Sequence, residues 1–395
     1  MAEPMNPGPL HEEFMDWARE NEVQIDGIAA AKFNGRGIGI VAKNDLKENE
    51  RILFVPEKML FSNTVFALKD WRMTKSQTVH GRLASRLALT HRDSNENNPC
   101  DNKWTMVWPS QQEMELAMPI CWPPPLQEQL PPYAKSLLDK QKRKFDKDLA
   151  EFEKDAPLNL RDVFKYYWLV VNTRCFYWNY PNRKDGKLMA KRIKQNPDDA
   201  MALAPFIDYF NHADEGCTVM ATEDGFTVNA NRYYKAGEEV YVSYGSHSND
   251  FLLVEYGFIL ENNKWDETIL DTCLIPMLND EQKDRLESHG FLGNYTLDAS
   301  QICYRTQVAL LVLVLPAKEW LSVIEKGEDV DQNTVKEPCR DLLSRYIVKI
   351  DKSLAGLRNA PGNQRRQILI ARWRQVRRLA TIHLQKVEER ESDMT

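Results

Sequence analysis

The feature of this sequence that most constrains its fold is an alternation of local pattern along the chain. Residues 27–62 and 201–260 hold short runs rich in β-branched residues, separated by tight turns. Residues 63–195 and the chain after about 265 instead show the apolar spacing of helices. We therefore predict an α+β fold in which the two β-rich segments form one core of short strands with a helical insertion, followed by an all-α C-terminal domain.

The predicted boundaries follow from these changes of pattern. The first domain is placed at residues 1–264, with its core at 26–62 and 200–260 and its helical insert at 63–199. The second, all-helical domain is placed at 265–395. A chain of 395 residues suits two or three domains of ordinary size.

Composition excludes several classes of protein. The chain has 52 Lys and Arg against 58 Asp and Glu, so its formal net charge of −6 gives no chain-wide reason to bind nucleic acid. The seven cysteines include no C-x-x-C pair, so no metal cluster is predicted, and their odd number favours reduced thiols in a cytoplasmic or nuclear protein. No apolar run approaches the ~20 residues of a membrane helix, and the N-terminal residues lack a signal-peptide pattern. We expect a monomer without membrane contact.

Three short motifs in the β-rich segments carry the functional signal. The first is the Gly-rich turn at residues 34–39, and the second is the D-x-x-N-H sequence at residues 208–212. The third is G-E-E-V-x-V-x-Y-G at residues 237–245, followed by Y-G-F at 256–258. Each motif alone has an ordinary structural explanation: a tight turn, a capped helix or an amphipathic core tyrosine.

Taken together and in this order, the motifs resemble the SET-domain protein methyltransferases. The closer resemblance is to the branch typified by the Rubisco large-subunit lysine methyltransferase, which includes fungal ribosomal-protein and elongation-factor lysine methyltransferases. That branch carries a helical insert ending in S/T-R-x-F, which matches residues 173–176, and a helical C-terminal domain. It lacks the cysteine-rich zinc segment that follows the SET domain in histone methyltransferases, as does this sequence.

The resemblance implies that the cofactor is S-adenosylmethionine (SAM). The residues implied to hold it are Arg36, Gly37, Ile38, Arg174, Asn211, His212, Tyr244 and Phe258. Arg174 would pair with the SAM carboxylate, because the planar guanidinium matches a carboxylate bidentately. Asn211 would bind the methionyl amine, the backbone of His212 the adenine, and Phe258 would stack on the adenine ring. Plant relatives have an acidic residue where Arg36 stands, which leaves the packing around the adenosine open.

The same resemblance implies a channel for the substrate amine. The implied catalytic residues are Tyr244, Tyr256 and Asp208, and Thr173, Phe176 and Val242 would line the channel. A lysine amine must be neutral to attack a methyl group, and its ordinary pKa of about 10.4 keeps it charged at neutral pH. An apolar channel and the positive sulfonium would lower that pKa. Asp208 could act as a base or only orient the amine.

We interpret the chain as a SAM-dependent lysine methyltransferase of a non-histone protein, most plausibly a ribosomal protein or a translation factor. One alternative is a histidine methyltransferase of the same fold; a relative of that kind has Asn where Phe176 stands and lacks the tyrosine of Y-G-F. Another is an inactive SET protein that only binds a partner. The basic residues between Arg365 and Lys386 suggest an RNA or ribosome contact, or else the solvated face of a packing helix.

Overall fold

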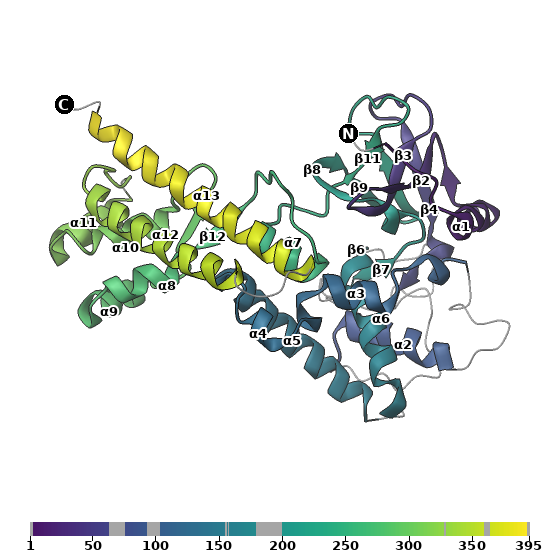
Figure 1. Cartoon of the computed structure of the whole chain (residues 1–395), viewed down its shortest axis with the longest axis horizontal. Helices are drawn as coiled ribbons and strands as arrows, with labels where there is room; N and C mark the ends of the chain where they lie inside the picture. The colour runs from purple at the N-terminus through teal and green to yellow at the C-terminus, as the bar shows by residue number, and fades with distance from the viewer. Residues whose placement is uncertain are drawn as a thin grey trace. The chain divides into compact units, whose positions relative to one another are not determined.

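The computed structural model describes residues 3–62, 76–92, 103–154, 156, 158–178, 200–327, 329–358 and 364–392. The chain forms two compact units (Figure 1): unit 1 comprises residues 1–115 and 140–246, and unit 2 comprises residues 116–139 and 247–395. Unlike the predicted boundary at 264, this division places residues 116–139 and 247–264 with the C-terminal helices. Of the predicted insert, residues 63–75, 93–102 and 179–199 lie outside the described residues.

In its described residues, unit 1 contains three small sheets of short strands, as predicted for its two β-rich segments. One sheet has the order β1-β4-β10-β9, the second β11-β3-β2 and the third β5-β7-β6. The strands of these sheets are β1 (Gln24–Ile25), β2 (Ile28–Phe33), β3 (Gly37–Ala42), β4 (Arg51–Pro56), β5 (Phe61–Ser62), β6 (Cys175–Tyr177), β7 (Met201–Leu203), β9 (Val219–Thr222), β10 (Gly225–Asn229) and β11 (Glu239–Val240). One further strand, β8 (His212–Cys217), lies between β7 and β9 along the chain.

The order of pairing explains how the two β-rich segments share one core. Strand β4 from the first segment pairs antiparallel with β10 from the second, and β3 pairs with β11. The Gly-rich motif is the turn of the β2–β3 hairpin, in which Phe33 faces Gly37 across the strands. Strand β11 is two residues long, and Val242, two residues further along, forms isolated bridges to both ends of β8.

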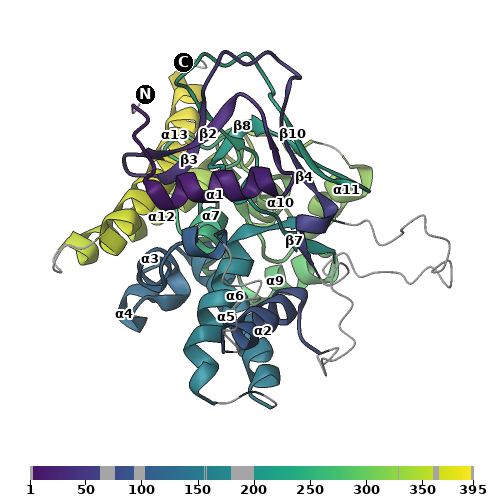
Figure 2. The same cartoon turned by 90° about the vertical axis from the view of Figure 1, so that its right-hand side faces the viewer.

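Helices of the insert support one side of the core of unit 1. They are α2 (Val79–Arg92), α3 (Gln111–Ala117), α5 (Pro132–Phe152) and α6 (Arg161–Arg174), with α1 (Pro9–Glu20) preceding the strands; α3 and α5 run across the division between the units. Helices α2 and α6 pack side by side (Figure 2). The buried Asp148 joins them: it accepts hydrogen bonds from the Thr78 backbone N–H at 2.7 Å and from Trp168 Nε1 at 3.0 Å. This packing fixes the C-terminal end of α6, where the S/T-R-x-F motif lies.

One part of the insert is not helical. Strand β6 directly follows α6 and pairs with β7, so that Phe176 lies opposite Ala202. The helical prediction for this segment was wrong at residues 175–177, because the strand is only three residues long and too short to show a periodicity of two.

Unit 2 confirms the predicted helical C-terminal domain. Its helices are α4 (Pro124–Gln127), α7 (Asn249–Tyr256), α8 (Asp271–Leu274), α9 (Asp280–Ser288), α10 (Tyr304–Leu311), α11 (Ala317–Lys326), α12 (Lys336–Arg358) and α13 (Gln364–Ser392). Helices α12 and α13 lie side by side (Figure 1) over one apolar core that includes Trp320, Leu342 and Leu369. Two short strands, β12 (Glu267–Ile269) and β13 (Thr296–Asp298), add a small antiparallel pair.

A buried ion cluster ties α13 to α7 within unit 2. Arg372 is fully buried, and its Nε donates to Asp250 Oδ1 at 2.7 Å while Nη1 donates to Asp266 Oδ2 at 2.6 Å. A third bond runs from Nη2 to the backbone carbonyl of Glu267 at 3.1 Å. Burial lowers the pKa of Arg372, but the two carboxylates outweigh this effect and hold the pKa above its usual range. The side chain is therefore a buried cation in the folded state.

Candidate active site

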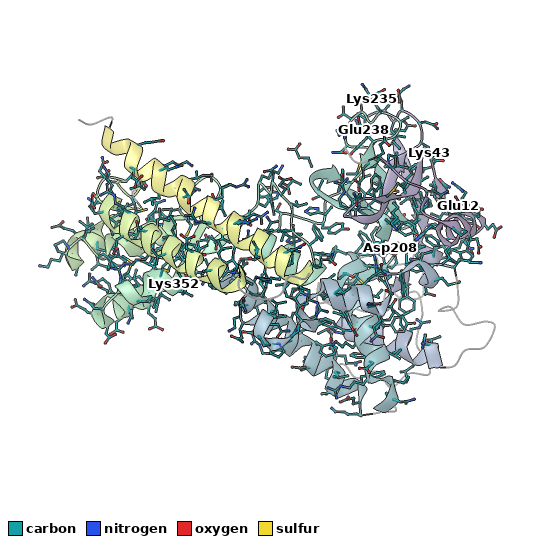
Figure 3. All side chains as sticks on the ribbon, viewed as in Figure 1. Glu12, Lys43, Asp208, Lys235, Glu238 and Lys352 are labelled. Atoms are coloured by element: carbon teal, nitrogen blue, oxygen red, sulfur yellow. The ribbon has the colours of Figure 1, made fainter. Side chains whose placement is uncertain are left out.

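The D-x-x-N-H motif places its aspartate in the interior of unit 1. Asp208 lies in a short 3-10 helix, Ile207–Tyr209, and its side chain is buried where the insert meets the sheets (Figure 3). Trp104 Nε1 donates to Asp208 Oδ2 at 3.1 Å. The other oxygen, Oδ1, is buried without a hydrogen-bond partner among the described residues. Burial raises the pKa of Asp208 above its usual range, although Arg174 and Trp104 oppose this rise.

Arg174 stands at the last position of α6 and reaches this aspartate. Its Nη1 donates to the backbone carbonyl of Asp208 at 2.9 Å, while its Nε is buried without a hydrogen-bond partner in the described part of the chain. A buried N–H donor without an acceptor is costly until an acceptor arrives. The residue is therefore suited to bind a carboxylate.

Tyr244 is fixed by three contacts. Its hydroxyl donates to the Phe210 carbonyl at 2.7 Å, its backbone N–H donates to His212 Nδ1 at 3.1 Å, and its ring stacks on the His212 ring with centroids 5.0 Å apart. Burial raises the pKa of Tyr244 to about 12, with the Arg174 charge opposing this rise. The hydroxyl is therefore neutral at physiological pH, and its oxygen keeps lone pairs that can face a ligand.

The predicted channel residues lie around the same point in the fold. Thr173 precedes Arg174, and its hydroxyl donates to the Leu169 carbonyl at 2.9 Å. Phe176 packs near Phe226, with centroids 5.9 Å apart. Val242 is fully buried, and its N–H donates to the Asn211 carbonyl at 3.0 Å. The roles of these side chains toward a substrate remain predictions.

A second cluster joins the Gly-rich turn to the D-x-x-N-H motif through a residue that the sequence analysis did not assign. Glu239 is buried, and it accepts a hydrogen bond from Asn211 Nδ2 at 2.8 Å. It also pairs with Arg36 at 2.5 Å and accepts from the Tyr241 hydroxyl at 2.7 Å. Gly37 and Ile38 begin strand β3 beside Arg36. The G-E-E-V motif drew attention to Glu239, but nothing in the sequence identified which of the two glutamates points inward.

Trp104 was also missed as a site residue. Its bond to Asp208 joins residues 104 positions apart. A contact of that length leaves no local signal in the sequence.

Tyr256 and Phe258 belong to unit 2, so their predicted contacts with substrate and adenine remain predictions. Tyr256 ends α7, and Gly257 has a φ of 81° at the C-cap of this helix. A Cβ at Gly257 would approach the Cβ of Ala117 to 2.9 Å, so both the backbone conformation and the packing require glycine. The glycine of Y-G-F is explained by the helix end, while the two aromatic rings lie 6.3 Å apart on either side.

The site fits SAM on the evidence of its own unmatched groups. Arg174 offers its buried Nε donor to a carboxylate, and Asn211 can offer its amide oxygen to an amine.

Among the described residues, no group of three His, Cys, Asp or Glu side chains could hold a metal ion. Within the same residues, no helix is long and apolar enough to cross a membrane.

Comparisons with known proteins agree with this geometry. The model of the SET domain matches residues 37–245, more than half of the chain. The chain belongs to the SET-domain family. A second model, described as the C-terminal domain of ribosomal lysine N-methyltransferase 2, matches residues 268–386.

Individual proteins are similar to the chain in sequence or in fold. It is 27% identical over 257 residues to ribosomal lysine N-methyltransferase 2 of Saccharomyces cerevisiae, covering 58% of this chain and 51% of that protein. It is 25% identical over 280 residues to actin-histidine N-methyltransferase of Danio rerio, covering 64% of this chain and 43% of that protein. The matches therefore span about half the length of these relatives. The crystal structure of the SET domain of LSMT bound to MeLysine and AdoHcy has the same fold, with a TM-score of 0.64 and 18% identity over 98% of this chain and 93% of that one.

The basic segment at residues 365–386 is only partly a surface feature. Arg366 and Arg372 are buried, so neither can contact RNA. Arg377 pairs with Asp351 at 2.7 Å, which neutralises part of the remaining charge. The solvated face therefore consists mainly of Arg374, Arg378 and Lys386, on a helix whose other side packs in unit 2.

Proposed function

We propose that this protein transfers methyl groups from SAM to a lysine side chain of a non-histone protein. The observation that carries the proposal is the arrangement of Tyr244, Arg174 and Asp208 in one partly buried cluster, in which Arg174 Nε and Asp208 Oδ1 have no hydrogen-bond partner among the described residues, in a chain of the SET-domain family. SAM supplies an electrophilic methyl group on its sulfonium.

Each residue of the cluster has a defined task in this proposal. Arg174 holds the SAM carboxylate through donors that the fold leaves unused. The Tyr244 hydroxyl donates its proton to the Phe210 carbonyl, so its oxygen lone pairs face the methyl region and stabilise it through C–H···O contacts. Since the pKa of Tyr244 is raised to about 12, this oxygen acts as a neutral acceptor and not as a phenolate base.

Asp208 orients the incoming amine in this proposal. Its Oδ1 has no partner among the described residues and can accept a hydrogen bond from the amine. The amine loses its proton to water in the apolar channel, where burial and the cationic sulfonium favour the neutral form. The narrow channel then aligns the nitrogen with the methyl group, which contributes to the rate by orientation.

The substrate we propose is a ribosomal protein or a translation factor. The match of residues 268–386 to the C-terminal domain model of a ribosomal lysine methyltransferase supports this choice. We propose that the protein acts as a monomer in the cytoplasm or nucleus, where such substrates are made and assembled. Contact of Arg374, Arg378 and Lys386 with ribosomal RNA belongs to the same proposal.

The test uses recombinant protein, radiolabelled SAM and purified ribosomal proteins and translation factors, followed by mass spectrometry of any labelled band. Methyl-lysine in the product supports the proposal. The similarity to an actin-histidine N-methyltransferase makes methyl-histidine the second candidate product, and finding it would replace lysine as the target. If saturating SAM fails to raise the thermal unfolding temperature, the chain is a binding module and not an enzyme.

A further inference from the structure

Glu239 is a buried carboxylate that has no role in the methyl transfer proposed above. Its side chain is about 5% exposed, and it holds three partners at once. Oε2 receives the guanidinium of Arg36 at 2.5 Å and the hydroxyl of Tyr241 at 2.7 Å, while Oε1 receives Asn211 Nδ2 at 2.8 Å. With donors on both of its oxygens, the Glu239 carboxylate acts as an acceptor toward all three partners.

The carboxylate decides which way the Asn211 amide faces. An amide oxygen against Glu239 would place two acceptors in contact, so the group that meets Oε1 must be the Nδ2 amine. The amide oxygen of Asn211 is therefore directed away from Glu239 and is available as an acceptor. An ammonium group has only donors, so it is bound by this orientation and repelled by the reverse one.

Arg36 and Gly39 make this arrangement possible. The Arg36 side chain is about half exposed, and it offsets the cost of burying the Glu239 charge. This pairing turns the cation of Arg36 toward Glu239. A Cβ at Gly39 would lie 2.6 Å from Asn211 Nδ2 and 2.8 Å from Glu239 Oε1, so only glycine leaves room for the bond between them.

We propose that Glu239 is a positioning residue, which fixes the Asn211 amide so that its oxygen accepts a hydrogen bond from the α-ammonium group of SAM, and that Arg36 holds the Glu239 carboxylate in place for this task. The proposal rests on the proposed function, because it concerns the same cofactor. It adds that recognition of the amine depends on a residue that does not touch it.

The substitution Glu239→Gln tests the proposal by reversing the polarity of one bond. Arg36 and Tyr241 are both donors, so they hold the amide oxygen of the new side chain and turn its amine toward Asn211. Asn211 then presents its own oxygen to Gln and its amine to the ligand. Adding a second substitution, Asn211→Asp, gives this position two acceptor oxygens. One accepts from the amide amine of the Gln side chain, and the other accepts from the ammonium group of the ligand. The matched control is Glu238→Gln, since Glu238 lies at the surface of unit 1 (Figure 3), paired with the exposed Arg232.

The measurement is isothermal titration of each variant with S-adenosylhomocysteine and with its analogue in which hydrogen replaces the α-amino group. We expect Glu239→Gln to weaken binding of S-adenosylhomocysteine at least tenfold and binding of the analogue less than twofold. The double variant recovers most of the lost affinity, and Glu238→Gln binds both ligands as the parent does. Circular dichroism confirms that each variant is folded.

Two results would overturn the inference. Equal weakening of both ligands shows that Glu239 only supports the fold, and an unchanged affinity for both shows that it does not orient the amide. If the parent protein binds neither ligand, the cofactor part of the proposed function fails, and this result differs from both of the others. The identity of the methylated residue does not affect the titration.

Discussion

Replacing Arg372 by Met removes the cation from the buried cluster of unit 2 and should be among the most destabilising single changes in the chain. Two charge-assisted hydrogen bonds, at 2.7 and 2.6 Å, are lost together with the bond to the Glu267 carbonyl. Asp250 and Asp266 then remain buried without a counter-ion. Breaking a buried ion pair in this way costs about 3–5 kcal/mol. For a unit of this size the unfolding temperature should fall by roughly 6–20 °C.

The loss of stability caused by Arg372→Met should also depend on pH, and the direction of this dependence follows from the buried carboxylates. Burial already raises the pKa of Asp250, and Arg372 opposes that rise. Without Arg372 the folded-state pKa rises further above the unfolded value of about 3.9. The folded variant then binds protons more tightly than its unfolded chain, so its stability is retained near pH 4 and is lost as the pH rises through the folded pKa.

Thermal and denaturant unfolding of unit 2, followed by circular dichroism at pH 4.5 and 7.5, measures both effects. Arg374→Met is the matched control, since Arg374 is exposed on the same helix and should change stability by less than about 0.5 kcal/mol. Adding Asp250→Asn and Asp266→Asn to Arg372→Met should recover part of the loss. A cost below about 1 kcal/mol at pH 7.5, or the same cost at both pH values, would refute the reasoning.

Three further changes test the site in unit 1. Tyr244→Phe should lower methyl transfer at least tenfold while SAM affinity stays within threefold, because only the hydroxyl oxygen is lost; a parental rate would disprove the assignment. Asp208→Asn should raise the unfolding temperature at pH 7.5, since the pKa of Asp208 is raised by burial and the charged form destabilises the fold as pH rises through that pKa. This gain in unfolding temperature should vanish toward pH 4, and an equal gain at pH 4 and pH 7.5 would contradict the explanation. Gly39→Ala should weaken S-adenosylhomocysteine binding at least tenfold by titration, because its Cβ would displace the Asn211 amide; unchanged affinity would show that the pair can shift.

Much of the architecture could be predicted because it depends on local pattern. Regular apolar spacing predicted the helical segment that contains α5 and α6, and short β-branched runs between tight turns predicted the strands of the core. Strand β6 could not be predicted, since three residues carry no period and its pairing with β7 joins positions separated by more than twenty residues.

The site was predictable to the extent that its residues occur in short motifs. Arg174, Asp208 and Tyr244 each stand in such a motif, and the structure brings them together in unit 1. Trp104 and Glu239 were not assigned, because their tasks depend on which side chains surround them after folding. The burial of Arg372 was equally hidden, since an arginine on a basic helix is usually solvated and nothing nearby in the sequence indicates two distant carboxylates.

The buried cluster of unit 2 also determines where this protein can be divided for expression. A fragment ending at residue 264 contains every motif of the SET resemblance, but it separates Asp250 from both Arg372 and Asp266. Helix α7, which carries Tyr256, would then begin with a buried carboxylate that has lost its counter-ion. Limited proteolysis should accordingly yield no stable product that ends between α7 and α13, because such a product keeps Asp250 without Arg372.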